Sequence, residues 1–182
     1  MSSTVALNLT NIIRTGGKMS KTTAITGACG EHYVAAYLSA LDFVVALPRG
    51  GVPSCDLLVT TESAGKSISI QVKTATSPLN KLRGEHYYAW PTSAKAMNLV
   101  SNSHWYAFVN LNNWPENDTH PEVFFIPSNI VAAEIKKAYE NEDKWLFFCI
   151  NCSDAEQYKG KKGISIIQGT LPIQRTKYPK SV

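Results

Sequence analysis

The sequence has no long apolar segment, and this absence narrows the possible classes of protein. No uninterrupted apolar stretch approaches the roughly 20 residues that a membrane-spanning helix needs. The N-terminus lacks the charged start, long apolar centre and small-residue cleavage site that mark a secretory signal peptide. We therefore expect a cytoplasmic protein. Its 182 residues, 44% hydrophobic and 18% charged, have the composition of an ordinary folded domain.

Cysteine is also scarce, which argues against a disulfide framework. The chain has four cysteines, at positions 29, 55, 149 and 152. Cys149 and Cys152 have the spacing of half a zinc site, but the other two are far apart and form no second half. Cys149 also ends an apolar run, where a buried thiol is common. The sequence therefore predicts free, buried thiols rather than a zinc or redox centre.

Several motifs of well-known enzyme classes are missing, and acidic residues are absent from the C-terminal part. There is no Walker-type glycine loop, dinucleotide fingerprint or Gly-x-Ser-x-Gly elbow. The net charge is +4, and residues 158–182 contain no acid but six basic residues, namely Lys159, Lys161, Lys162, Arg175, Lys177 and Lys180. Such a segment could neutralise phosphates of a nucleic acid, or it could be a solvated tail that keeps the protein soluble.

The order of predicted elements is typical of an α/β fold. Residues 1–20 resemble a flexible leader, and we expect residues 21–182 to form a single domain with a basic C-terminal segment. Helices are expected over 26–40 and after a cap at Ser128, and strands over 43–47, 56–61, 67–74, 105–111, 123–126, 145–150 and 164–167. Residues 76–91 are polar and predicted to be irregular, with an aromatic cluster (Tyr87, Tyr88 and Trp90) that either packs over the sheet or stacks on nucleic acid. The sequence thus predicts a central mixed β-sheet flanked by helices.

Asp56 and the triplet Gln71-Val72-Lys73 are the residues that most strongly indicate chemistry. They lie 15 positions apart, on two predicted strands joined by a short turn. Strand alternation places Gln71 and Lys73 on one face and Val72 on the other. Carboxylate and amide oxygens are ligands that Mg²⁺ prefers, and a lysine can stabilise negative charge on a phosphodiester. The pattern therefore predicts a metal and phosphate site suited to cleaving nucleic acid.

Together with an acid in the first helix, these residues resemble the PD-(D/E)xK nuclease superfamily in its Gln-x-Lys version. That version is similar to intron-encoded homing endonucleases and transposon-end endonucleases of this fold. The resemblance spans about residues 27–130 and depends on Glu31, Pro53-x-x-Asp56 and Gln71-Val72-Lys73. It implies a restriction-endonuclease-like core. It also implies an Mg²⁺-dependent endonuclease, with Mn²⁺ as a substitute, that hydrolyses duplex DNA as a homodimer or larger homo-oligomer.

The resemblance also implies roles for individual residues. Glu31, Asp56, Gln71 and the backbone carbonyl of Val72 would hold the metal, and Lys73 would act on the scissile phosphate or orient the attacking water. Further contacts to DNA are predicted for Arg49, Thr74, Ser77, Lys81, Arg83, Lys161 and Lys162. Two alternatives stay open. Asp56 could be a structural acid paired with Lys73, and the neutral Gln71 could mark a degenerate nuclease fold that binds nucleic acid or another partner without cutting.

Overall fold

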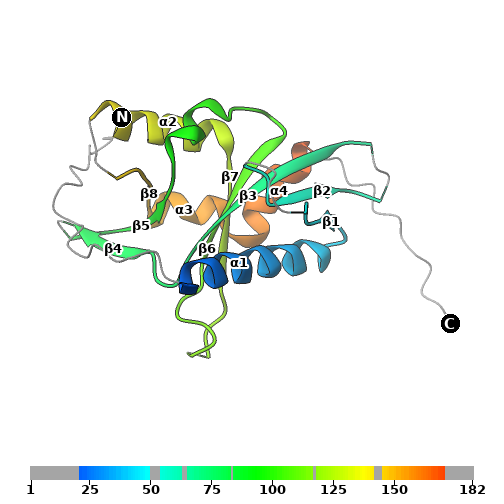
Figure 1. Ribbon diagram of the computed structural model, residues 1–182, viewed down its shortest axis with the longest axis horizontal. Coiled ribbons are helices and arrows are strands. Elements are labelled where there is room, and N and C mark those ends of the chain that lie inside the picture. Colours follow the sequence, from blue (N-terminus) through cyan, green and yellow to red (C-terminus); the bar gives the residue numbers. More distant parts are fainter. Residues whose placement is uncertain are drawn as a thin grey trace.

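The computed structural model describes residues 21–170 except 50–53, 63–64, 83, 117 and 142–144, and Figure 1 shows its elements. The helices are α1 (Lys21–Ser39), α2 (Ser128–Glu140), α3 (Cys152–Ala155) and α4 (Gly160–Thr170), with short 3₁₀ turns η2 (Ala94–Asn98) and η3 (Glu156–Tyr158). The strands are β1 (Val44–Ala46), β2 (Leu57–Thr60), β3 (Ser67–Ala75), β4 (Leu79–Leu82), β5 (Glu85–Pro91), β6 (His104–Asn110), β7 (Glu122–Pro127) and β8 (Phe147–Asn151).

A five-stranded mixed sheet forms the centre of the fold, in the order β1-β2-β3-β6-β7. β1, β2 and β3 pair antiparallel, β3 and β6 pair parallel, and β7 is antiparallel to β6. Because β3 and β6 are parallel, the chain must cross over between them, and it does so through β4, β5 and η2. The predicted α/β core with a central mixed sheet flanked by helices is therefore confirmed.

One face of this sheet packs against α1 and α4. Val34 and Leu38 of α1, and Ile164 and Ile167 of α4, share a buried cluster with the inward-facing side chains of β2, β3, β6 and β7. Along β3 this face carries Ile68, Ile70 and Val72, while Ser69, Gln71 and Lys73 point to the other side. The alternation that defines the two faces was predicted from the sequence, and the buried side is the one that contacts α1.

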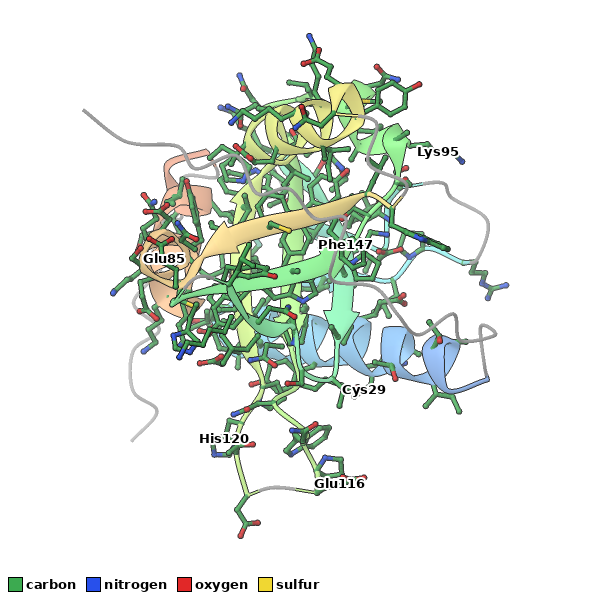
Figure 2. The ribbon with its side chains drawn as sticks, turned by 90° about the vertical axis from the view of Figure 1, so that its left-hand side faces the viewer. Cys29, Glu85, Lys95, Glu116, His120 and Phe147 are labelled. Atoms are coloured by element: carbon green, nitrogen blue, oxygen red, sulfur yellow. The ribbon has the colours of Figure 1, made fainter. Side chains whose placement is uncertain are left out.

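Over β6 and β7 the other face is covered by α2 and by a second sheet of order β4-β5-β8, which Figure 2 shows crossing in front of the main sheet. The prediction of an irregular segment over 76–91 was wrong, since this segment forms the β4–β5 hairpin. Strand β5 is stabilised by aromatic packing across the two sheets: the Trp90 ring lies tilted against Phe108 and Phe124, and Tyr88 contacts Phe124. Of the two interpretations of this aromatic cluster, packing over the sheet is the one observed.

Two further local predictions were wrong. Residues 164–167 lie in helix α4, where Ile164 and Ile167 pack at helical spacing, because a short apolar run fits a helix as well as a strand. Ser128 is the first residue of α2 rather than its cap, and the cap position is Pro127. The Ser128 hydroxyl instead donates a 2.9 Å hydrogen bond to the carbonyl of Ser101 and accepts a 3.0 Å hydrogen bond from the N–H of Ser101.

The four cysteines all lie within the described part of the chain and none of them forms a disulfide, as predicted, although each is partly rather than fully buried. Among the residues that the structure describes, no helix combines the length and apolar character required to cross a bilayer. The predicted leader and the basic residues after Thr170 lie outside the described residues.

Candidate active site

Asp56 lies where β2 separates from β3. Its N–H donates to the carbonyl of Ile70 at 3.0 Å, next to the pair Leu57–Ile70 that begins the β2–β3 ladder. The next N–H of β3 that points toward β2 is that of Val72, and it donates to Oδ2 of Asp56 at 2.7 Å instead of to a backbone carbonyl. The carboxylate thus replaces a backbone carbonyl as the acceptor at the end of the ladder. One oxygen of Asp56 is held by the sheet, and the orientation of the whole group is set.

Gln71 and Lys73 lie on either side of Val72 and are both partly exposed on the face opposite α1. Val72 itself is buried in the core beneath α1. In a strand, the N–H and C=O of one residue point to the same edge, so the Val72 carbonyl faces the edge at which Asp56 lies. The structure therefore brings the Asp56 carboxylate and the Val72 carbonyl to one edge of β3, with the Gln71 and Lys73 side chains on the adjacent face.

Glu31 reaches this edge from α1, and a glycine allows the approach. α1 passes so close to β3 at Gly30 that a Cβ there would overlap the hydroxyl of Thr74 and lie 2.9 Å from its Cβ and Cγ2. Only a residue without a side chain fits between helix and strand at this point. Since Glu31 follows directly, the close packing places its carboxyl near the end of the β2–β3 ladder, where β3 has no β2 partner beyond Ile70.

The charges of the site influence one another. The pKa of the Glu31 carboxyl is raised above its ordinary value of 4.5, first by partial burial and then by the negative charge of Asp56. The charges of His32 and Lys73 act in the opposite direction. Glu31, Asp56 and Lys73, three residues proposed from widely separated parts of the sequence, are therefore close enough in the fold for their charges to interact.

This raised pKa predicts a pH-dependent contribution to stability. Because the folded protein holds the Glu31 proton more tightly than the unfolded chain does, the contribution is fully present below the unfolded pKa and is lost as the pH rises through the folded pKa. We expect wild type to lose stability relative to Glu31→Gln as the pH rises from about 4 to about 8. Urea denaturation of both proteins across this range measures the difference. A difference that is constant, or that changes in the opposite direction, would contradict the raised pKa.

The donor set fits a hard divalent cation. It consists of carboxylate, amide and carbonyl oxygens, which are the ligands that Mg²⁺ takes in proteins, and Oδ1 of Asp56 is not engaged by the Val72 N–H. Only Glu31 and Asp56 in this set are acids. No group of three or more His, Cys, Asp or Glu side chains that could hold a metal ion occurs within the described ranges of the chain.

The other residues predicted to contact DNA are spread over the molecule. Arg49, Ser77 and Lys81 are exposed at or near strands β1, β3 and β4, whereas Lys161 and Lys162 are exposed on α4, which packs on the opposite face of the sheet from Gln71. The Thr74 hydroxyl is buried under Gly30, directed into the α1–sheet contact, and has no hydrogen-bond partner in the described part of the chain. Arg83 lies outside the described residues.

Two residues beside the site were not predicted from the sequence. Ser69 precedes Gln71 by two positions on the same face of β3, and its hydroxyl lies 2.8 Å from Nδ1 of His104 at the start of β6. The parallel register pairs these two residues directly. The sequence contains no signal for this contact, because the partners are 35 positions apart and meet only through a parallel pairing.

Comparison with known proteins places the chain at a distance from characterised ones. No protein-family model matches it, and no curated protein matches it. Among solved structures, it is similar to a bacterial homing endonuclease, I-Ssp6803I, with 13% sequence identity and a TM-score of 0.49 over 81% of this chain and 94% of that one.

Proposed function

We propose that this protein is a metal-dependent endonuclease that hydrolyses phosphodiester bonds in duplex DNA. One observation carries the proposal: the Asp56 carboxylate is fixed by the Val72 N–H at the end of the β2–β3 ladder, beside Gln71 and Lys73 and within electrostatic reach of Glu31. Acids, a neutral oxygen donor and a lysine gathered at one sheet edge form a suitable arrangement for holding a divalent cation against a phosphate.

Each residue has a role that follows from its position. Asp56 offers the oxygen that Val72 does not engage, and Glu31 and the oxygens of Gln71 and Val72 complete the set that would hold Mg²⁺, or Mn²⁺ in its place. Bound there, the metal would supply Lewis-acid stabilisation of charge on the phosphate and a more acidic water. Lys73 presents its ammonium group to the same face, where it stabilises negative charge on the phosphate oxygens and helps to orient the water.

A second candidate is a nucleic-acid-binding or interaction protein on the same fold that does not cut. The observation in its favour is the charge of the donor set. Glu31 and Asp56 supply the only carboxylates of this set, and Gln71 contributes a neutral amide oxygen. A neutral amide oxygen attracts a cation less strongly than a carboxylate does, so the set would hold a metal less well than three acids would.

Substitution of Lys73 tests the first candidate against the second. We expect Lys73→Ala to lower the cleavage rate by about 100-fold or more, because a charged group at the developing negative charge is removed. Cleavage is measured on linear, supercoiled, branched and single-stranded DNA, with Mg²⁺ and with a chelator. The same panel shows which form of DNA is the substrate and whether cutting depends on the metal.

A matched control removes a lysine elsewhere. Lys136 is an exposed residue of α2 that pairs only loosely with Glu140, at 3.8 Å, so Lys136→Ala is expected to cleave as wild type does. Salt-dependent DNA binding without cleavage on any substrate, and unchanged by Mg²⁺, would favour the second candidate. Cutting by Lys73→Ala at the wild-type rate would remove Lys73 from the mechanism. Two cuts, one in each strand, would call for two sites and hence for a homo-oligomer, which light scattering of the DNA complex would detect.

A further inference from the structure

The pair Ser69–His104 lies beside the proposed site, and neither residue is one of the proposed metal ligands. Along β3, the face opposite α1 carries Ser67, Ser69, Gln71 and Lys73 in alternating positions. Alternate residues of a strand are about 6.7 Å apart, a spacing comparable with that between successive phosphates of one nucleic-acid strand. Ser69 is the next position along this line from the proposed metal ligand Gln71, and it is the one that contacts His104.

This part of the face is open to a ligand. Leu58, the cross-strand neighbour of Ser69 on β2, is 45% exposed, and Ser67 and Ser103 are exposed on either side. Ser69 itself is partly exposed, whereas His104 behind it is only 7% exposed. A strand of nucleic acid lying across Lys73 and Gln71 would therefore meet the Ser69 hydroxyl next, with His104 supporting that hydroxyl from the interior.

The hydrogen bonds indicate which ring nitrogen of His104 carries the proton. Burial lowers the pKa of His104, an effect larger than the opposing influence of Asp56, so the ring is neutral at pH 7 and carries one proton. Its Nε2 is buried and has no hydrogen-bond partner among the residues that the structure describes. A buried N–H without a partner is rarer than a buried lone pair without one, so we assign the proton to Nδ1. Nδ1–H then donates to the Ser69 oxygen, at 2.8 Å.

The consequence is a hydroxyl proton that is available to a ligand. With its oxygen accepting from His104, Ser69 can donate its own proton, and the partner it has in the fold is the Ser103 carbonyl at 3.4 Å, a long and weak contact. A phosphate oxygen is a charged and therefore stronger acceptor than that carbonyl.

We propose that Ser69 is a hydrogen-bond donor to the phosphate next to the one that is cleaved, and that His104 is the positioning residue that directs its hydroxyl. The ligand is the sugar–phosphate backbone of the substrate strand, which the hydroxyl recognises independently of base sequence. This inference rests on the proposed nuclease function and extends the site by one nucleotide along β3.

The test combines a protein variant with a modified substrate. Ser69→Ala is expected to raise KM for a cleavable duplex about tenfold, as for the loss of one hydrogen bond to a charged group, with kcat changed by less than about twofold. Duplexes with a single uncharged methylphosphonate at successive positions beside the cut then locate the contact. One position should weaken binding by wild type and have no further effect on Ser69→Ala.

Variants of His104 separate positioning from a merely structural role. His104→Asn keeps an N–H donor near the place of Nδ1 and should retain a KM close to that of wild type. His104→Phe removes the donor and should raise KM as Ser69→Ala does. Ser165 is an exposed serine of α4 whose hydroxyl donates to the Lys161 carbonyl of its own helix, and Ser165→Ala should change nothing.

The outcomes distinguish a failure of this inference from a failure of the proposed nuclease function. If wild type neither binds nor cleaves any duplex, the proposed function fails and this inference fails with it. If wild type cleaves and Ser69→Ala has the wild-type KM, the inference alone is overturned. A His104→Phe protein that melts at a lower temperature but keeps the wild-type KM would show that the pair only joins β3 to β6, and would also overturn it.

Discussion

Replacing Gly30 with alanine is expected to destabilise the protein and to reduce cleavage, whereas the same change at Gly27, one turn earlier in α1, should do neither. A Cβ at Gly30 would overlap the Thr74 hydroxyl, so helix and strand must separate, and overpacking of this kind costs about 1–3 kcal/mol. Apart from its chain neighbours and the backbone of α1, none of the described residues has an atom within 4 Å of where a Gly27 Cβ would be, so alanine there should stabilise the helix by about 0.5–1 kcal/mol. Thermal unfolding should show opposite shifts, of several degrees downward for Gly30→Ala.

The effect on activity follows from the neighbour of Gly30. Separating α1 from β3 moves Glu31 away from Asp56 and Lys73, so the loss of cleavage should exceed what the loss of folded protein explains at the assay temperature. Thr74→Ala in the Gly30→Ala background removes the Oγ1 and Cγ2 contacts and leaves the Cβ at 2.9 Å, so it should restore part of both stability and activity. Equal stabilisation by alanine at both glycines would show that α1 does not need this close approach.

The second large effect is expected at Asp56, where two substitutions should separate structure from chemistry. Asp56→Asn removes the charge but keeps an oxygen that can accept the Val72 N–H, so stability should change little while cleavage falls by about 100-fold or more. Asp56→Ala also leaves that N–H without its partner, and the free energy of unfolding should fall by a further 1–3 kcal/mol or so. Urea denaturation and cleavage assays on the same preparations measure both quantities.

The control for these variants is an acid with no place in the site. Asp154 is exposed on α3, and Asp154→Asn should match wild type in both assays. Titration calorimetry with Mg²⁺ or Mn²⁺, in the presence of a non-cleaved DNA duplex, should show metal binding that both Asp56 variants lose. Wild-type cleavage by Asp56→Asn would refute the assignment of Asp56 to the metal, and with it the observation on which the proposed function depends.

The parts of the fold that could be predicted are those in which neighbouring residues decide the structure. Strand β3 was predicted to within a residue because polar and apolar side chains alternate along it, and α2 because its apolar residues recur at helical spacing. The β4–β5 hairpin was missed because its strands are stabilised by packing of Trp90 and Tyr88 against aromatic residues of β6 and β7 that lie far along the chain. The 164–167 run was misassigned because four apolar residues suit either structure.

The candidate site shows the same division. The chemistry of Asp56, Gln71 and Lys73, and the faces on which the two β3 residues lie, follow from residue type and strand alternation, so the sequence by itself determined which groups are available. Tertiary structure alone decided three things. The Asp56 carboxylate accepts the Val72 N–H at the end of the β2–β3 ladder, Gly30 lets α1 bring Glu31 to that edge, and His104 lies behind Ser69. Each depends on how one element packs or pairs with another, and no local pattern in the chain encodes that geometry.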